Sequence, residues 1–407
     1  MTFALFLAGN VRWLAGGMLL TFFSSVGQTF FIAGFAGAIR EDFGLSHGGF
    51  GVIYMLATLG SAASLIIVGR VLDEISVVKV ATGLILMLAG SALLMSAATT
   101  VPVLLLSIYL LRLFGQGMMT HTAMVAMGRW FVAERGRAVA VTTTGHQLGE
   151  GILPLVSVAL LSIAGWRTAW MTAAGVLVCI ALPLCYYCLR IPRSPLTREG
   201  DDHESGRQWT RAEVLRDAPF WAVCTGVLAP AFIGTSVFFH QVHLAELKSW
   251  APGVIAGSFA VMSVTSVTVG LFTGHLIDRY SARMLLPFFL CPLALGCIVL
   301  SVAAAPLTMT VFMCLLGCSY GLSSAVFGAI WPEVYGTRHL GAVRAVVSAA
   351  MVFASALGPG LTGWLIDQGV GFESQLLGMS AYCLATMMVL FPVSRVLRLR
   401  QAQVVYT

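Results

Sequence analysis

Long hydrophobic stretches follow one another along nearly the whole chain, separated by short polar gaps. A helix needs about 20 mostly apolar residues to cross the hydrocarbon core of a bilayer, and about twelve stretches reach that length. They lie at residues 13–38, 50–69, 77–97, 102–124, 138–163, 168–188, 219–243, 253–275, 283–303, 307–330, 341–365 and 374–395. Because a helix satisfies all its own backbone hydrogen bonds in lipid, the pattern predicts an all-α integral membrane protein of about twelve transmembrane helices.

Composition agrees with a lipid-embedded chain. Hydrophobic residues make up 58% of the sequence and charged residues 10%, whereas a soluble domain carries roughly 25% charged residues. The first stretch is too long, and too closely followed by the next, to be a cleaved signal peptide. These features exclude an ordinary soluble protein.

Positive charge alternates between the gaps. All but four of the 23 Lys and Arg residues lie in every second gap, and the exceptions are Arg40, Arg167, Lys248 and the intrahelical Arg112. Cytoplasmic loops carry the excess of Lys and Arg, so we expect a multi-pass protein of the cytoplasmic (inner) membrane with both termini in the cytoplasm. The net charge of +6 then needs no nucleic-acid partner.

The longest polar segment divides the chain into two halves. It predicts an N-terminal six-helix bundle at 1–189, a cytoplasmic linker at 190–217 and a C-terminal six-helix bundle with a short tail at 218–407. Near the end of the linker, Thr210 and Glu213 have the spacing of a capping box that opens a short surface helix.

The two halves repeat each other, which is typical of transporters that alternate access around a central site. Gly69 and Asp73 mark the end of the second stretch as Gly274, Asp278 and Arg279 mark the end of the eighth, and we interpret them as a conformational latch. Small residues and prolines also mark the fifth and eleventh stretches, where they allow close helix packing and bending. These are Gly145, Gly149, Pro154, Gly358, Pro359 and Gly363.

Two strong charges lie near the middle of predicted helices. Arg112 and Glu150 fall roughly 10 and 12 residues inside stretches 102–124 and 138–163, where an ionisable group is a functional candidate by default. An Arg offers a planar fork to a carboxylate, and a carboxylate can carry a proton. We expect Arg112 to hold either Glu150 or a substrate anion, with His146, one turn before Glu150, as a possible relay. The structural alternative is a fixed ion pair, or Arg112 bonded to backbone carbonyls.

Other polar residues within the stretches outline a candidate cavity. They are Ser24, Gln28, Thr235, Ser236, Tyr320 and Ser323. The sequence contains no metal-binding, phosphate-binding or catalytic motif in a suitable context. We therefore expect neither a cofactor nor an enzyme, and transport driven by a gradient.

Four short segments together resemble the major facilitator superfamily. They are residues 69–73 (GRVLD), 112–117 (RLFGQG), 165–167 (GWR) and 363–367 (GWLID). The resemblance extends over essentially the whole chain, and it implies a twelve-helix transporter fold that usually works as a monomer.

Within that superfamily, residues 129–138 and 145–149 are similar to the monocarboxylate porters and the oxalate/formate antiporters. This resemblance implies a small organic anion moved with a proton or by exchange. The sequence is thus interpreted as a secondary active transporter of a small organic anion, a monocarboxylate, coupled to protons. An alternative is a proton-driven exporter of drugs or amphipathic metabolites. A transporter-shaped sensor and a membrane-embedded enzyme are further alternatives, disfavoured by the short tail and the missing catalytic cluster.

Overall fold

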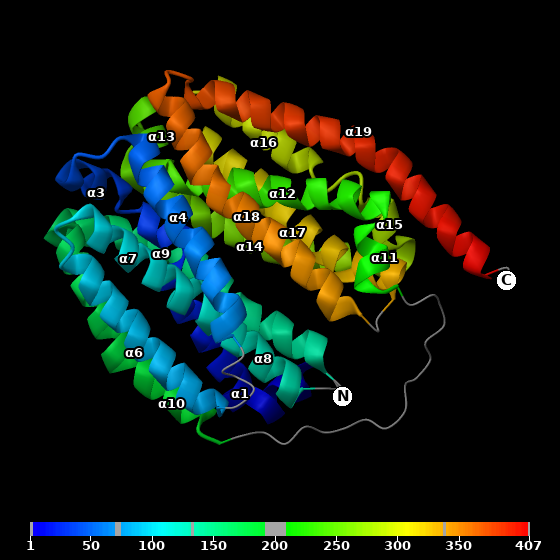
Figure 1. Cartoon of the computed structure of the whole chain (residues 1–407), viewed down its shortest axis with the longest axis horizontal. Coiled ribbons are helices and arrows are strands. Elements are labelled where there is room, and N and C mark those ends of the chain that lie inside the picture. Colours follow the sequence, from blue (N-terminus) through cyan, green and yellow to red (C-terminus); the bar gives the residue numbers. More distant parts are fainter. Residues whose placement is uncertain (1–2, 70–74, 132–133, 192–208, 337–338, 406–407) are drawn as a thin grey trace. The chain divides into compact units, whose positions relative to one another are not determined.

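The computed structural model describes residues 3–69, 75–131, 134–191, 209–336 and 339–405. Within these ranges the regular structure is entirely helical (Figure 1). Backbone contacts divide the chain into two units, Met1–Asp201 and Asp202–Thr407. The division falls inside the predicted linker, of which residues 192–208 lie outside the described part of the chain.

The first unit is built from long apolar helices joined by short connections. Its elements are α1 (Phe3–Phe23), η1 (Ser24–Gly27), α2 (Thr29–Ala33), α3 (Ala36–Phe43), α4 (His47–Val68), α6 (Val77–Ser96), α7 (Val101–Leu111), η2 (Arg112–Met119), α8 (Thr120–Trp130), α9 (Arg135–Val176), η3 (Leu177–Ala181) and α10 (Leu182–Leu189). The long α9 contains two spans, because Gly165 has φ 74° and turns the chain sharply between them. Only glycine adopts that backbone conformation without a steric cost.

The second unit has the same general plan. Its elements are α11 (Arg211–Leu215), α12 (Ala218–Phe239), α13 (Gln241–Leu247), α14 (Pro252–Tyr280), α15 (Ala282–Leu285), α16 (Cys291–Val302), α17 (Leu307–Tyr335), α18 (Leu340–Asp367) and α19 (Phe372–Val405). The predicted capping box is confirmed: Thr210 accepts from the backbone N–H of Glu213, and the Glu213 carboxylate accepts from the backbone N–H of Thr210 at 2.8 Å.

Helices coincide with all twelve predicted stretches. Ten described helical segments are long and apolar enough to cross a membrane. One of them, Gly136–Leu189, contains two predicted stretches, and the shorter α16 accounts for another. The stretch 283–303 is not one helix, because residues 286–290, which include Pro287, form a turn between α15 and α16. A proline ring cannot donate the helical hydrogen bond and clashes with the preceding turn.

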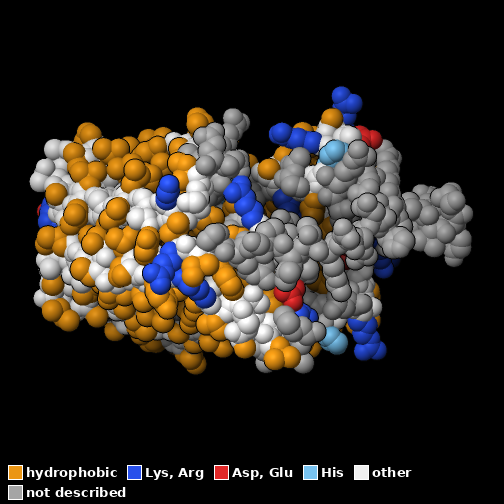
Figure 2. Space-filling view, turned by 90° about the horizontal axis from the view of Figure 1, so that it is seen from below, with side chains coloured by type: hydrophobic (Ala, Val, Ile, Leu, Met, Phe, Trp, Pro, Cys, Tyr) orange, Lys and Arg blue, Asp and Glu red, His pale blue; other side chains and the backbone are white. Residues whose placement is uncertain are grey.

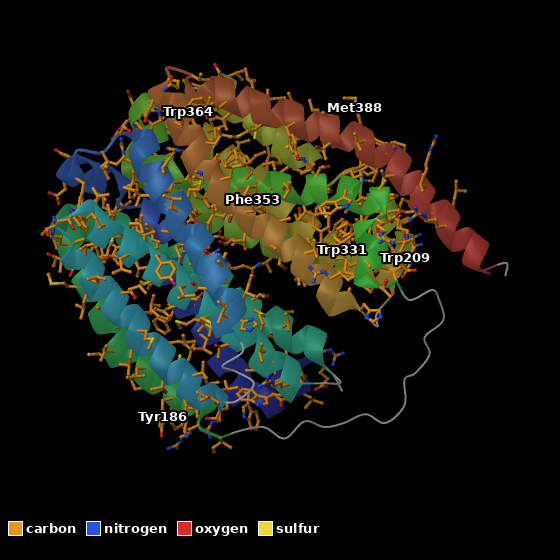
Figure 3. All side chains as sticks on the ribbon, in the orientation of Figure 1. Tyr186, Trp209, Trp331, Phe353, Trp364 and Met388 are labelled. Carbon is orange, nitrogen blue, oxygen red and sulfur yellow. The ribbon has the colours of Figure 1, made fainter. Side chains whose placement is uncertain are left out.

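The outer surface is apolar where lipid would contact it. Hydrophobic side chains cover much of the described face in Figure 2. Among the side chains labelled in Figure 3, Met388 is 69% exposed, and Phe353 and Trp364 are also more than half exposed. Exposed apolar patches of this extent on a soluble protein would cause association. The fold is therefore that of an all-α, multi-pass membrane protein.

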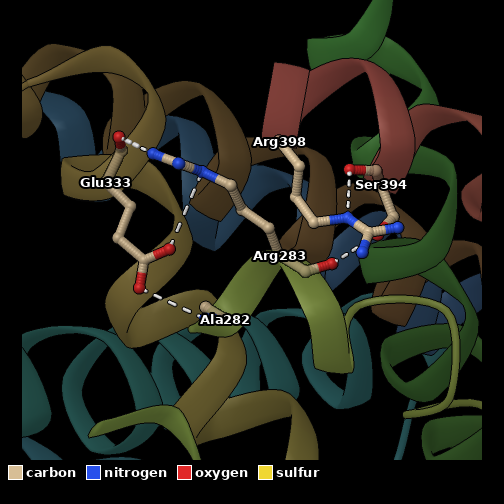
Figure 4. A network of polar contacts seen from close by, with 5 residues as sticks. All are labelled: Ala282, Arg283, Glu333, Ser394 and Arg398. Atoms are coloured by element: carbon tan, nitrogen blue, oxygen red, sulfur yellow. Dashed lines mark hydrogen bonds and ion pairs between the residues drawn. The ribbon is translucent and has the colours of Figure 1, made fainter. Parts of the chain in front are cut away.

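A polar network joins the ends of α15, α17 and α19 in the second unit (Figure 4). The Arg283 guanidinium pairs with the Glu333 carboxylate and donates to the Glu333 carbonyl oxygen. That carboxylate also accepts from the backbone N–H of Ala282 at 3.2 Å. Ser394 donates to the carbonyl oxygen of Arg283 at 2.7 Å, and Arg398 donates to that of Ser394 at 3.4 Å. Three helices far apart in sequence are thus held at one point.

An aromatic cluster stands beside α11 and the end of α17. Trp331 stacks on Tyr335 with ring centroids 6.3 Å apart, and Phe220 meets Trp331 edge-on at 5.5 Å. Trp209 meets Tyr335 edge-on at 5.5 Å, and its backbone N–H donates to the Tyr335 carbonyl (Figure 3). The cluster fixes the point at which the chain enters the second unit.

Candidate functional site

The first transmembrane span is interrupted in its middle. Helix α1 ends at Phe23, a 3₁₀ turn covers Ser24–Gly27, and Gln28 is extended with φ −88° and ψ 157° before α2 begins. Ser24, Ser25 and Gln28 are all buried there. A broken span leaves backbone groups free to bind a side chain or a ligand, and many transporter sites are built on this feature.

A second irregular segment packs against this break. Residues Arg112–Met119 form a π-helix within the fourth span, and π segments occur frequently at functional sites. A Cβ added at Gly115 would lie 2.7 Å from the Gly27 Cα, so the two backbones touch directly. Close approach of this kind requires glycine on both sides.

Arg112 begins the π-helix and is almost completely buried, with 1% of its surface exposed. Its Nη1 donates at 3.3 Å to the Gly27 carbonyl oxygen and at 3.3 Å to the Thr29 hydroxyl. The guanidinium lies over the Tyr54 ring, 5.2 Å from its centroid, and the Tyr54 and Thr29 hydroxyls are 2.7 Å apart. The Nε is buried and has no hydrogen-bond partner. Arg112 therefore keeps an unused donor beside the break in the first span.

Glu150 lies on α9 and is also buried, at 8% exposure. Within the described chain, no hydrogen bond or ion pair joins its carboxylate to another residue. Pro154 lies four residues later and has no N–H, so the backbone carbonyl of Glu150 also lacks its helical donor. The preceding residue, Gly149, packs against Ser25. The buried hydroxyl of Ser25 likewise has no hydrogen-bond partner. The carboxylate and the carbonyl of Glu150 and the hydroxyl of Ser25 are thus polar groups of this region without a partner in the described chain.

The expected relation between the two charges is not an ion pair in this structure. Arg112 bonds to the broken first span instead, which is the carbonyl-bonded alternative that the sequence left open. His146 is partly buried one turn before Glu150, and its ring lies 5.9 Å from that of Phe30. Arg112, Glu150 and His146 all belong to the first unit and approach the region around η1 and α2.

The second-unit candidates lie on α12 and α17. Tyr320 donates to the Pro230 carbonyl at 3.4 Å, and its hydroxyl lies directly over Gly234, next to the half-buried Thr235. Ser236 donates at 2.8 Å to a carbonyl of its own helix, so its hydroxyl is already satisfied. The buried hydroxyl of Ser323 has no partner.

The predicted helix-packing residues lie where two helices come close together. A Cβ added at Gly145 or Gly149 would collide with the first span, and one at Gly358 would lie 2.7 Å from the Ser236 hydroxyl. Pro359 and Gly363 are buried within α18. Small residues therefore allow close contacts of α9 with α1 and η1, and of α18 with α12.

The structure describes the predicted latch only in part. Gly69 follows α4, and a Cβ added there would lie 3.4 Å from the Nε2 of His121. A Cβ added at Gly274 would have no atom within 4 Å. The exposed Arg279 stacks over Tyr280. Asp73 and the Asp278 side chain lie outside the described residues. The latch thus stays a prediction.

Two partners of Arg112 escaped the sequence analysis. Tyr54 is one of several aromatic residues in an apolar stretch, and nothing local distinguishes it. Thr29 ends the polar run Ser24–Thr29, whose composition marked an irregular segment. A run of serines, glycine and glutamine in the middle of a span was the available signal for the break.

Comparison with known proteins decides the family. The family model of the Major Facilitator Superfamily matches residues 17–261 and 231–405. The chain belongs to the Major Facilitator Superfamily. Members of this superfamily are membrane transporters.

Among curated relatives of this superfamily member, an uncharacterised protein of Mycobacterium tuberculosis is 29% identical over 251 residues, 59% of this chain and 58% of that protein. The chain therefore spans less than two thirds of that relative. The probable sulfoacetate transporter SauU of Cupriavidus necator is 24% identical over 381 residues, 88% of each chain. Monocarboxylate transporter 13 of Bos taurus is 27% identical over 311 residues, 75% of this chain and 71% of the relative.

Solved structures agree on the fold. A bacterial homologue of the human lysosomal transporter Spinster, inward-facing and unoccupied, superposes with a TM-score of 0.74 at 15% identity. The superposition covers 95% of this chain and 97% of the other. The twelve-helix transporter fold predicted from the sequence is thereby confirmed.

Proposed function

We propose that this protein is a secondary active transporter that moves a small organic anion, a monocarboxylate, together with protons. It acts in the cytoplasmic membrane as a monomer, by alternating access, with both termini in the cytoplasm and without a cofactor. The observation that carries the proposal is the presence of two buried, opposite charges in one unit, Arg112 and Glu150, that do not pair with each other.

Arg112 supplies the anion-binding part of the proposal. Its guanidinium is held by Gly27, Thr29 and Tyr54 in one orientation, so little conformational entropy remains to be lost when an anion binds. Its Nε has no partner. A carboxylate arriving beside the broken span would accept from this donor and neutralise the buried cation.

Glu150 supplies the proton-coupling part. A buried carboxylate without a partner is costly when charged and much less costly when protonated. Uptake of a proton at Glu150, together with an anion at Arg112, leaves the loaded transporter without added net charge. The membrane potential then neither drives nor opposes its reorientation, since the potential acts only on net charge moved.

The names of relatives support the same class of cargo. One is a probable sulfoacetate transporter and another a monocarboxylate transporter. Sulfoacetate and monocarboxylates are both small organic anions. The alternation of Lys and Arg between gaps supports the cytoplasmic placement of both termini.

The test is uptake of labelled small carboxylates into proteoliposomes under an inward-directed proton gradient. We expect Glu150→Gln to lose gradient-driven uptake by about tenfold or more, equivalent to about 1.4 kcal/mol. It should retain exchange of cargo across the membrane, because a permanently neutral side chain permits reorientation. Glu41→Gln is the matched control, since Glu41 is an exposed acid in the short helix α3. Equal gradient-driven uptake by Glu150→Gln and wild type would refute proton coupling at this residue.

Export of cationic amphipathic compounds is the second candidate. The observation in its favour is that no cation among the described residues pairs with the buried Glu150 carboxylate, so that the charge of a cationic cargo could do so. Export predicts that Arg112→Lys is tolerated and Glu150→Gln is not, whereas anion transport predicts loss in both. Arg216→Lys, an exposed arginine, is the matched control. Dye efflux without uptake of any carboxylate would favour the exporter.

A further inference from the structure

In the described part of each unit, an ion pair joins two separate connections between spans. In both units the cation also donates to a backbone carbonyl at the end of the third span, beside a third connection: Ala98 just after α6, and Ser301 in the last turn of α16. Within each unit, all three connections follow an odd number of spans. We refer to the two sets of contacts as the first rim clasp (Asp42, Ala98, Trp166, Arg167) and the second rim clasp (Lys248, Trp250, Ser301, Glu373).

The first rim clasp lies in the first unit. Arg167 pairs with the carboxylate of Asp42 in the last turn of α3, and its Nη2 donates to the Ala98 carbonyl at 2.9 Å. The Trp166 indole donates to the same carboxylate at 3.1 Å, and the guanidinium lies 4.2 Å from the centroid of that ring. The clasp ties α3, the connection between α6 and α7, and the bend at Gly165 in α9.

The second rim clasp lies in the second unit. Lys248 follows α13, and its Nζ lies 3.1 Å from the Glu373 carboxylate and donates to the Ser301 carbonyl at 3.4 Å. Ser301 donates from its hydroxyl to the Glu373 backbone carbonyl at 2.9 Å. The Trp250 indole donates at 2.7 Å to Ala304, on the connection after α16.

The two clasps occupy corresponding positions of the repeat. The short helices α3 and α13 follow the first span of each unit, and Ala98 and Ser301 lie where the third span ends. Arg167 and Glu373 each begin the sixth span, shortly after a glycine with positive φ, at 74° and 84° respectively. The signs are exchanged: the acid comes first in the first clasp and last in the second. Exchange of sign leaves a Coulomb attraction unchanged.

We propose that the two rim clasps are one conformational device, built twice with opposite charge order, that makes the three connections at the rim of each unit move as a single rigid body. The proposal rests on the proposed transport function only for its purpose, since alternating access rocks one repeat against the other. The ion pairs, and their formation with either order of acid and base, are properties of the folded protein and do not depend on transport.

The exposure of the pairs predicts how strong each clasp is. The side chains of Arg167 and Asp42 are 39% and 40% exposed, whereas that of Lys248 is 8% exposed. Breaking the first clasp should raise local amide exchange about two- to fivefold, the range that a half-exposed ion pair supports. Breaking the second should raise it about tenfold or more, because a buried cation loses its partner.

The experiment measures hydrogen–deuterium exchange of the full-length protein in lipid nanodiscs, without any cargo. The first set of variants is Asp42→Lys, Arg167→Glu and the double exchange. The decisive peptide covers residues 94–102, which carry no substitution. Each single variant should speed exchange there. The double variant should restore it to within about twofold of wild type, because a lysine at position 42 can donate to the Ala98 carbonyl as Lys248 donates to that of Ser301, whereas a glutamate at position 167 cannot donate. Glu41→Lys, which adds the same charge one residue away, is the control and should leave that peptide unchanged.

The second set is Lys248→Glu, Glu373→Lys and their double exchange, with the peptide covering residues 299–306 as readout. Asp42→Asn and Glu373→Gln break the pairs without reversing charge and replace any reversal that fails to fold. Unchanged exchange at the third connection in the single variants would overturn the proposal, as would a double variant whose effect is the product of the two singles. If the wild-type protein took up no carboxylate but the hydrogen–deuterium exchange of the variants changed as expected, the proposed function would fail and the rim clasps would stand.

Discussion

The contact between the broken first span and the π-helix makes a quantitative prediction. A Cβ at Gly115 would lie 2.7 Å from the Gly27 Cα, 2.9 Å from its nitrogen and 3.1 Å from the Ser24 carbonyl oxygen. All three are backbone atoms, so no side chain can turn away. Carbon atoms pack at about 3.5–4.0 Å, so Gly115→Ala must separate the two segments by roughly 1 Å.

Overpacking of this kind costs about 1–3 kcal/mol. Gly117 lies in the same π-helix, and a Cβ there would make ordinary contacts at 3.5 Å. Gly117→Ala is therefore the matched control, and the better helix propensity of Ala should leave stability unchanged or raise it by up to about 1 kcal/mol.

The assay is thermal unfolding of the purified protein in detergent. For a unit of this size, 1 kcal/mol shifts Tm by about 2–4 °C, so Gly115→Ala should lower Tm by about 2–12 °C. Gly117→Ala should not lower it. If Gly115→Ala melted within about 1 °C of Gly117→Ala, the backbone contact would not be rigid, and the argument from close approach would fail.

Three further predictions concern polar contacts. Arg400 donates to both oxygens of the buried Asp217 at 2.9 Å, so Arg400→Gln should destabilise the protein by about 1–3 kcal/mol, seen as a lower Tm, with exposed Arg395→Gln as control. Tyr54→Phe removes a 2.7 Å hydrogen bond to a threonine hydroxyl but keeps the ring, so it should lower stability by about 1 kcal/mol and weaken anion uptake, and unchanged uptake would contradict the anion site. The hydrogen bond from the rim arginine holds the pKa of Asp42 below its ordinary value. Its stabilising effect is therefore complete above about pH 4 and is lost as pH falls through the lower, folded-state pKa, so the Tm difference between wild type and Asp42→Asn should vanish in acid.

Hydrophobic length made most of the fold predictable. A span must contain about 20 apolar residues whatever its neighbours are, so all twelve helices could be located from the sequence. The turn at Gly165 was also visible, since the GWR segment and its flanking apolar stretches marked a short connection. The interruption of 283–303 at Pro287 was not predicted, because the apolar run continues through it and satisfies the length of a span.

The site was less predictable than the spans. Arg112 and Glu150 were identified because a charge in a membrane span is rare and expensive. Their partners were not, because Gly27, Thr29 and Tyr54 come from other helices and have no charge to mark them. Which side chain a buried arginine meets depends on how three helices pack, and that information is not local.

The sequence by itself determined the class of protein, the number and place of its spans, and the two residues whose burial demands an explanation. These follow from one-dimensional quantities: the length of apolar stretches, the distribution of charge and the cost of a charge in lipid. Only the tertiary structure decided that the first span breaks at Ser24–Gln28, that Arg112 bonds to this break rather than to Glu150, and that an ion pair joins corresponding connections within each unit. Each of those depends on close contacts between segments far apart in the chain, where a distance of 1 Å decides whether a contact exists.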